Sequence, residues 1–210
     1  MSIPQAQIRY TEDQYLAIER EADERHEYLD GRIYAMAGES PEHGAICINL
    51  TREVSAQLKG SRCQAFSRDT RVRSGPLPRR RPSQKGLYSY PDLVIVCEEL
   101  QFLDENRDTL INPKVIIEVA SPSTGSFDHG EKFRRYRKFN PSLKDYLIVA
   151  QNHPFIEHFA LQENGQWVIA ASVTELSGSV HIASINCALQ LKEVYDRVEF
   201  PEEEEEPDDE

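Results

Sequence analysis

Apolar residues recur every four positions from Ile46 to Leu58, and this spacing predicts an amphipathic helix. Gly60 follows the last of them and is expected to end that helix. Two other helices are indicated by their first residues, because Thr11 opens a capping box and Asp128 is followed three positions later by a glutamate. The expected helices span about 11–25, 46–58, 128–139 and 188–198.

Short apolar segments rich in β-branched residues predict the strands. Asp30-Gly31 and Asn164-Gly165 each stand between two apolar segments and indicate hairpin turns. The segment 74–89 contains three prolines and two glycines and is expected to be a loop. Strands are expected within 28–34, 63–73, 92–97, 114–120, 146–149, 155–159 and 167–170. Helices and strands interleave without a regular βαβ order, so we expect an α+β fold with a mixed β-sheet flanked by helices.

The chain is acidic overall, but its charge is unevenly distributed. Of the formal net charge of −12 at pH 7, eight negative charges lie in the last ten residues, which leaves −4 for the rest. Such a tail cannot bury apolar surface, so we expect one domain over 1–200 and a disordered acidic tail over 201–210. Basic residues are concentrated in the segments 68–85 and 132–144, which is compatible with contacts to nucleic-acid phosphates.

The four cysteines form no close pair and no Cys/His cluster; they are Cys47, Cys63, Cys97 and Cys187. We therefore expect neither a disulfide nor a zinc site, but four small buried side chains in a reducing compartment. No apolar run approaches the roughly 20 residues that span a bilayer, and the first residues lack the pattern of a signal peptide. The expected location is the cytoplasm, with no membrane partner.

Two acidic residues stand in apolar, strand-like segments, where an unpaired carboxylate is costly. Glu118 interrupts the segment 114–120, and Asp92 begins the segment 92–97 directly after Pro91. If these strands run antiparallel, the start of one lies beside the end of the other, so both carboxylates lie at the same end of the sheet. Such a pair suits a divalent-cation site. The alternative for each residue alone is a strand-end carboxylate hydrogen-bonded to a neighbouring loop.

The helix expected from Asp128 presents Lys132 and Tyr136 four residues apart on one face. Beside a metal-bound water or a phosphate, Lys132 can orient or deprotonate the water or stabilise the phosphate charge. A solvated surface lysine is the alternative on the helix pattern alone. The hydroxyl residues between Ser121 and Thr124 have no histidine and acid in triad-like motifs, so they are expected to shape the strand-to-helix turn.

Several ordered motifs resemble the Uma2 family, a bacterial group of proposed restriction endonucleases in the PD-(D/E)XK superfamily. The main motifs are Tyr90-Pro91-Asp92-Leu93-Val94, Ile117-Glu118-Val119-Ala120-Ser121-Pro122 and Asp128-His129-Gly130-Glu131-Lys132. Further matches are the segment from Glu27 to Tyr34, His43, and the segment from Asp145 to Val149. The resemblance covers residues 8–198.

The resemblance implies a restriction-endonuclease-like fold in which Asp92 and Glu118 bind Mg²⁺ or Mn²⁺. The superfamily's usual lysine, two residues after the glutamate, is replaced here by Ala120, whereas the family pattern has its lysine on the next helix, at Lys132. Glu27 matches a further carboxylate position of the family, which implies an additional metal ligand. A surface glutamate at a helix end is the alternative for that residue.

The expected function is metal-dependent hydrolysis of phosphodiester bonds in DNA, with Asp92, Glu118 and Lys132 as catalytic residues. DNA is the expected partner, and cleavage of both strands of a duplex favours a homodimer. One alternative is a nucleic-acid-binding or regulatory module without cleavage, which the acidic charge favours. A weaker alternative is a sugar hydrolase with a carboxylate pair, which the adjacent lysine disfavours. The sequence leaves two roles open for His43, that of a site residue and that of a core or capping histidine.

Overall fold

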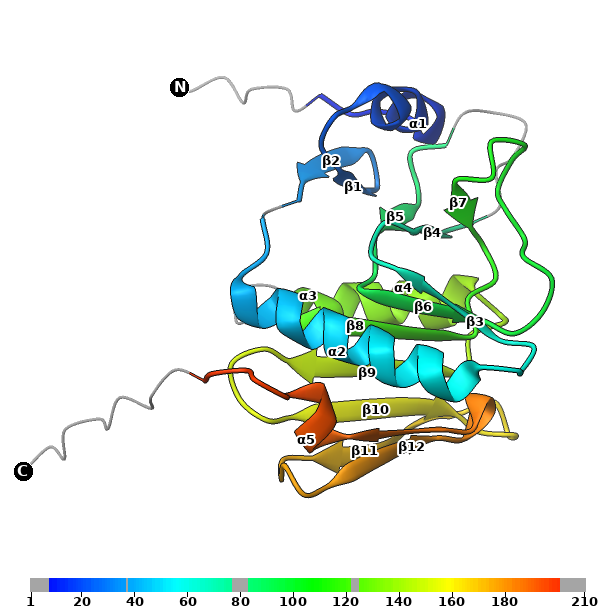
Figure 1. Ribbon diagram of the computed structural model, residues 1–210. Helices are drawn as coiled ribbons and strands as arrows, with labels where there is room; N and C mark the ends of the chain where they lie inside the picture. The colour runs from blue at the N-terminus through cyan, green and yellow to red at the C-terminus, as the bar shows by residue number, and fades with distance from the viewer. Residues whose placement is uncertain (1–7, 37, 77–82, 122–124, 201–210) are drawn as a thin grey trace, which may run out of the picture.

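The structure is a computed structural model that describes residues 8–36, 38–76, 83–121 and 125–200. Within these residues the strands form a six-stranded sheet, a five-stranded sheet and a two-stranded hairpin, and helices pack on them (Figure 1). Parallel and antiparallel pairs occur in both larger sheets. The expected α+β class, with mixed sheets flanked by helices, is confirmed.

The six-stranded sheet has the order β11-β10-β9-β8-β6-β3, and its neighbours are antiparallel except for the parallel pair β8 and β9. Its strands are β3 Gln64–Ser67, β6 Leu93–Val96, β8 Val115–Ala120, β9 Asp145–Ala150, β10 Ile156–Leu161 and β11 Trp167–Val173. Strands β6, β8 and β9 are buried along their whole length. That burial on both faces explains why these segments are almost continuously apolar in the sequence.

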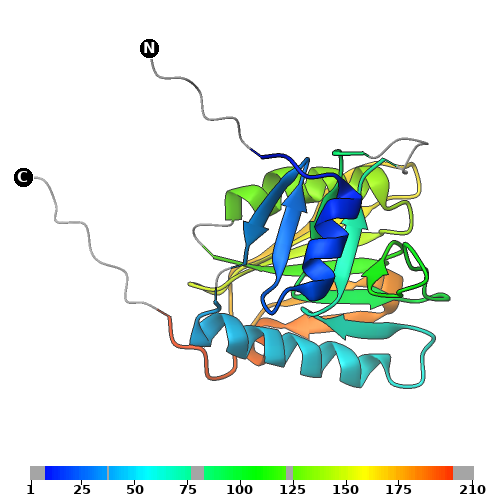
Figure 2. The ribbon, with the colours of Figure 1, turned by 90° about the horizontal axis from the view of Figure 1, so that it is seen from above.

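Helices and a hairpin cover both faces of this sheet. They are α2 Pro41–Leu58, α3 Gly125–Phe127, η1 Asp128–Lys132, α4 Phe133–Phe139, β12 Ser179–Ile182, η2 Ala183–Ile185, β13 Cys187–Gln190 and α5 Leu191–Val194. Alternate residues of β6 face two separate cores. Leu93 packs in the core that α2 and the β12–β13 hairpin cover, and Val94 packs in the core that contains Phe133 and Tyr136 of α4. Figure 2 shows α2 and α4 on opposite sides of the sheet.

Helix α2 confirms the prediction made from the four-residue spacing. Ile46, Leu50, Val54 and Leu58 are all buried in one core. The helix begins earlier than expected, at Pro41, because the Ser40 side chain accepts a hydrogen bond from the His43 N–H and caps its first turn. It ends before Gly60, which has a φ of 80°.

The five-stranded sheet has the order β2-β1-β5-β4-β7. Its strands are β1 His26–Leu29, β2 Arg32–Ala35, β4 Arg71–Ser74, β5 Leu87–Ser89 and β7 Thr109–Leu110. Helix α1 (Glu12–Glu21) packs on this sheet through Tyr15, which contacts Tyr28 and Tyr88 in a separate core. The predicted capping box at Thr11 and the predicted hairpin turn at Asp30-Gly31 are both confirmed.

Three local predictions were wrong. The segment 63–73 is not one strand, because it turns after β3 and its two halves pair in different sheets. The end of the predicted loop 74–89 forms β5, while its residues 77–82 lie outside the described part of the chain. The predicted helix at 188–198 is reduced to α5, because the residues before it pair with β12. Pairing with strands distant in the sequence outweighs the local pattern in each case.

The prediction of four unbonded cysteines was also wrong. Cys63 precedes β3 and Cys97 follows β6, and these antiparallel strands place Gln64 opposite Val96. The register therefore brings the two cysteines together, and they form a disulfide across 34 residues of sequence. Cys47 and Cys187 are free cysteines. Spacing along the chain concealed the bond, because strand register is not visible in it.

No helix in the described ranges is both long enough and apolar enough to cross a bilayer. The acidic tail expected to be disordered, residues 201–210, lies outside those ranges. The division into a domain over 1–200 and a tail stays a prediction.

Candidate active site

Asp92 and Glu118 lie at the same end of the six-stranded sheet. Strands β6 and β8 are antiparallel with Leu93 opposite Ile117, so Asp92 lies beside Glu118 along the edge that these strands share. Asp92 Oδ2 accepts a hydrogen bond of 2.7 Å from the backbone N–H of Val119, which fixes the carboxylate against β8. The expected pairing and position are confirmed, whereas the catalytic roles of the two residues stay predictions.

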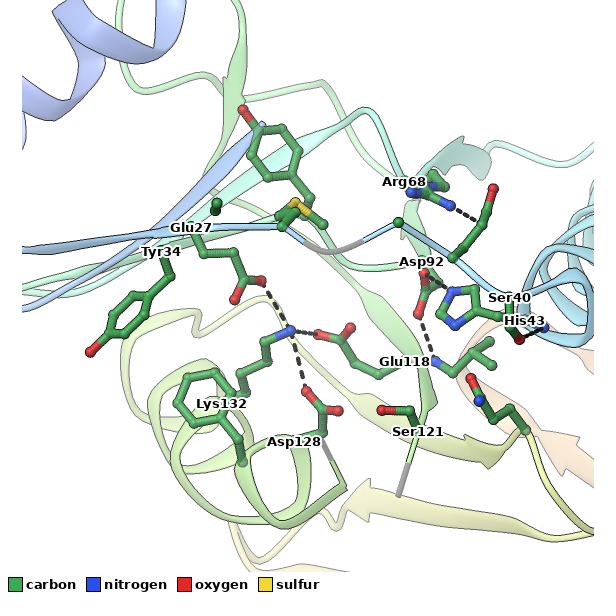
Figure 3. A pocket seen from close by; sticks show the side chains of 18 residues that line it. Glu27, Tyr34, Ser40, His43, Arg68, Asp92, Glu118, Ser121, Asp128 and Lys132 are labelled. Carbon is green, nitrogen blue, oxygen red and sulfur yellow. Dashed lines mark hydrogen bonds and ion pairs between the residues drawn. The ribbon is translucent and has the colours of Figure 1, made fainter. Parts of the chain in front are cut away.

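Lys132 lies at the centre of a group of carboxylates (Figure 3). Its Nζ is 3.1 Å from Glu27 Oε1, 3.2 Å from Asp128 Oδ1 and 3.5 Å from Glu118 Oε1. Burial alone would lower the pKa of Lys132, but the three carboxylates outweigh it and hold that pKa well above its usual value. Lys132 is therefore a buried positive charge and not a solvated surface lysine.

Glu118 is 3% exposed and is held by side chains around it. The Tyr136 hydroxyl donates to Glu118 Oε1 at 3.0 Å and lies 2.7 Å from Ser89 Oγ. Burial raises the pKa of Glu118 well above its usual value, Lys132 opposes that rise, and Asp128 adds to it. The structure thus gives this buried acid the partners that its place in an apolar strand requires.

Asp128 is a site residue that the sequence pattern presented only as the start of a helix. The helical run begins earlier, with α3, and the π-helix η1 carries both Asp128 and Lys132 into the protein. Asp128 is 3% exposed, and its Oδ1 accepts no hydrogen bond from any residue that the structure describes. The sequence could have indicated this role through the spacing of Asp128 and Lys132, because residues four apart on a helix lie on the same face.

Glu27 comes from the other sheet. It lies in β1, not at the end of α1, and its side chain is 17% exposed where it meets Lys132. The alternative of a surface glutamate at a helix end is therefore wrong. Because β1 belongs to the five-stranded sheet and Glu118 to the six-stranded sheet, the site is formed where the two sheets meet.

His43 is not the cap of α2, since its backbone N–H donates to the Ser40 cap, and its side chain faces the site. Its ring Nε2 lies 2.9 Å from Asp92 Oδ1, and Gln151 lines the same pocket. Burial acts to lower the pKa of His43, but the Asp92 carboxylate outweighs that effect and raises it. Cys47, one turn further along α2, also faces Asp92, and burial raises the pKa of its thiol.

Lys132, the carboxylates around it, Asp92 and His43 line a pocket of about 450 Å³. Its described lining includes two cations, Lys132 and Arg68, and the carboxylates of Glu27, Glu39, Asp92, Glu118 and Asp128. Arg68 is paired with Glu39, and Lys132 is shared by three carboxylates, so negative charge is in excess in this lining. A pocket of this charge attracts cations and repels a bare phosphate.

The residues fit a hard divalent cation. Carboxylate oxygens are the ligands that Mg²⁺ and Mn²⁺ prefer, and several of them converge on this pocket. Asp128 Oδ1 is buried in the same group and accepts no hydrogen bond within the described ranges; it forms the ion pair with Lys132 at 3.2 Å there.

Two arginines of the first basic segment are less available to phosphates than the sequence suggests, whereas its residues 79–81 lie outside the described part of the chain. Arg71 and Arg73 are ion-paired with acidic residues, and each side chain is only 4% exposed. On α4, by contrast, Arg137 and Lys138 are exposed.

Comparisons with known proteins agree with this geometry. Two uncharacterized proteins of Synechocystis sp. are similar to the chain, one with 32% identity over 80% of this chain and 88% of the relative, the other with 29% identity over 90% and 92%. A crystal structure from Anabaena variabilis, described as that of a "putative nuclease", has a TM-score of 0.69 and 18% identity, covering 89% of this chain and 97% of that one. That similarity shows the fold.

A family model, Uma2, described as "Putative restriction endonuclease", matches residues 12–190. This range runs from the first residue of α1 to the last residue of β13. It contains every residue of the carboxylate group and its lysine, and His43 as well. The chain therefore belongs to the Uma2 family.

Proposed function

We propose that the protein is a divalent-metal-dependent endonuclease that hydrolyses phosphodiester bonds of DNA. The observation that carries this proposal is the group of buried carboxylates around Lys132, in a pocket at the end of β6 and β8. Membership of the Uma2 family and the fold shared with a nuclease-like structure support the same class of function.

Asp92 and Glu118 are the proposed metal ligands, with Glu27 as an additional ligand and Asp128 as a further carboxylate in the same pocket. Mg²⁺ or Mn²⁺ bound there supplies Lewis acidity toward a phosphoryl oxygen and lowers the pKa of a bound water. The protein orients its ligands in advance, because the Tyr136 hydroxyl donates to Glu118 and the backbone N–H of Val119 donates to Asp92.

Lys132 is proposed to stabilise negative charge at the reacting phosphate, not to remove a proton. Its surrounding carboxylates raise its pKa, so the ammonium keeps its proton at neutral pH. A fixed ammonium in a site with little water stabilises developing charge more strongly than one in bulk solvent. The sequence alone left both roles open for this lysine.

The test uses variants that keep the shape of each ligand but remove its charge. Asp92→Asn and Glu118→Gln are expected to lose Mn²⁺ binding in calorimetry and to lose plasmid nicking. Lys132→Gln is expected to bind Mn²⁺ but to turn over more slowly by about 10²–10⁴-fold, as when one electrostatic group is lost. Asp104→Asn is the control, because Asp104 pairs with Arg20 outside the pocket. If Asp92→Asn binds Mn²⁺ as well as the parent, the proposal is wrong.

A second candidate function is a nucleic-acid-binding or regulatory module that keeps the nuclease fold without cleavage. The excess negative charge of the pocket favours it over a nuclease, because cleavage requires a phosphate to enter this pocket, whereas binding or regulation can use other surfaces, such as the exposed Arg137 and Lys138 on α4. The two functions differ in one assay. A binding module retains duplex DNA in the presence of Mn²⁺ and leaves it intact, whereas the proposed nuclease cuts it.

A further inference from the structure

A second group of metal-binding side chains lies beside the carboxylates, at the start of α2. His43 and Cys47 are four residues apart on this helix, so they lie one turn apart on the same face. Asp92 faces them from the start of β6. One donor atom from each residue, an imidazole nitrogen, a thiol sulfur and a carboxylate oxygen, lie within 4.8 Å of one another.

Other groups hold these side chains in place. The side chains of His43 and Asp92 are 17% and 12% exposed, and Cys47 is half-buried. Asp92 Oδ2 is held by the Val119 N–H, which leaves Oδ1 to face the His43 ring at 2.9 Å (Figure 3). Contacts of this kind orient metal ligands and strengthen binding.

We propose that His43, Cys47 and Asp92 form a binding site for a borderline divalent cation of the Zn²⁺ or Co²⁺ type. Nitrogen and sulfur donors favour such ions, whereas the all-oxygen group around Lys132 favours Mg²⁺ and Mn²⁺. Two ligands at positions i and i+4 of one helix are an arrangement that zinc sites use. Three protein ligands leave a fourth tetrahedral position, and His43 and Asp92 both line the pocket from which it can be filled.

The geometry requires only local adjustment. Zinc lies about 2.0 Å from nitrogen or oxygen and about 2.3 Å from sulfur, so the nitrogen, oxygen and sulfur ligands of a tetrahedral site lie about 3.3–3.5 Å apart. The contact of 2.9 Å between His43 and Asp92 lengthens slightly when an ion replaces the shared proton. The Cys47 sulfur, no more than 4.8 Å from the other donors, comes into range by rotation of its side chain. Binding releases the thiol proton and the proton shared by His43 and Asp92 to solvent, and the thiolate sulfur, the imidazole nitrogen and the carboxylate oxygen each donate an electron pair to the ion.

This site shares Asp92 with the proposed nuclease centre. An ion held by His43 and Cys47 engages the Asp92 carboxylate, which is then less available to an ion beside Glu118. Zinc is therefore expected to inhibit cleavage at concentrations at which Mg²⁺ still supports it. This consequence rests on the proposed function, whereas the binding site does not.

The test is a Co²⁺ titration of the full chain in excess Mg²⁺, followed by absorption. The parent is expected to show a thiolate-to-cobalt charge-transfer band that added Zn²⁺ removes. Cys47→Ser is expected to lose the band, and His43→Gln to weaken Co²⁺ binding at least tenfold. Cys187→Ser is the matched control, because Cys187 is the other free cysteine and lies in the core against α2. It is expected to keep the band.

A second measurement does not depend on the folding of any variant. In the parent, Zn²⁺ is expected to protect Cys47 from alkylation, read by mass spectrometry, whereas Mg²⁺ is not. An unprotected Cys47, a band that survives Cys47→Ser, or a band lost only in Cys187→Ser would each overturn the proposal. Cleavage assays of the same protein with Mg²⁺ alone, before Co²⁺ or Zn²⁺ is added, separate the two ideas. Cobalt binding by a protein that does not cleave DNA with Mg²⁺ alone contradicts the nuclease and leaves this site intact.

Discussion

Replacement of Lys132 by methionine, which has a similar volume and no charge, is expected to destabilise the metal-free protein. The substitution leaves Glu27, Glu118 and Asp128 without their common cation. Each lies within 3.5 Å of the ammonium in the parent. At an effective dielectric constant of about 20, two unit charges about 3.2 Å apart interact by about 5 kcal/mol.

The net loss of folding free energy is smaller than the sum of these Coulomb energies, because burial of the ammonium in the parent also costs its hydration free energy. Removal of one partner from a buried ion pair costs about 3–5 kcal/mol. We expect Lys132→Met to lower the free energy of unfolding at neutral pH by that amount. For a domain of this size the loss corresponds to a fall in Tm of about 10 °C.

The loss is expected to depend on pH, with a definite sign. Burial already raises the pKa of Glu118 well above its usual value, and Lys132 opposes that rise. Without Lys132 the folded-state pKa is higher still, so the native state binds more protons than the unfolded state. Stability then falls as pH rises. The deficit of the variant is small below about pH 4.5 and grows as pH rises through the folded-state pKa of Glu118.

Thermal unfolding of parent and variant between pH 4.5 and 8, with and without Mn²⁺, measures these effects. Mn²⁺ is expected to raise the Tm of the variant more than that of the parent, because the ion replaces the missing positive charge. Arg134→Met is the control, because Arg134 is exposed and lies two residues further along, in α4, which directly follows η1. A variant whose Tm equals that of the parent at pH 7.5 without metal would refute the reasoning.

Four further predictions concern other parts of the chain. Asp128→Asn removes one of three carboxylates that compete for one lysine, so scanning calorimetry should show an apo-protein more stable by about 1 kcal/mol and weaker Mn²⁺ binding. A chain that ends after Phe200 should keep its Tm and bind DNA equally or more tightly in a filter assay, and a large loss of stability would contradict this. Cys63→Ser opens a loop of 34 residues and should cost about 3–4 kcal/mol in denaturant unfolding, whereas a reductant should then affect only the parent. Light scattering at micromolar concentration should show a dimer, formed through the edge strand β11 with its exposed Val168 and Ile169, and a 24.1 kDa monomer alone would count against it.

Local chemistry in the sequence determined much of the fold. The capping box at Thr11 and the turn at Asp30-Gly31 act between residues that are neighbours along the chain, so their outcome does not depend on the rest of the protein. The apolar spacing of α2 likewise predicted its helical face from neighbouring residues, because any core that covers that face buries the same side chains. The positions of Asp92 and Glu118 also followed, because pairing two apolar strands in antiparallel order fixes which of their ends meet.

The tertiary structure decided which charges meet and which strands pair. Glu27 reaches Lys132 across 105 residues because two sheets pack at one point, and no periodicity of either segment encodes that packing. Burial of Asp128 likewise depends on the packing of the π-helix η1 against β8 and β9. The Tyr146 hydroxyl of β9 donates to the Asp128 carbonyl, and Lys132 of η1 pairs with Glu118 of β8. The Cys63–Cys97 bond and the meeting of Cys47 with Asp92 depend on strand register and helix placement. Such contacts are set by the free energy of the whole packed core, so residues far apart in sequence acquire their partners only when the chain is folded.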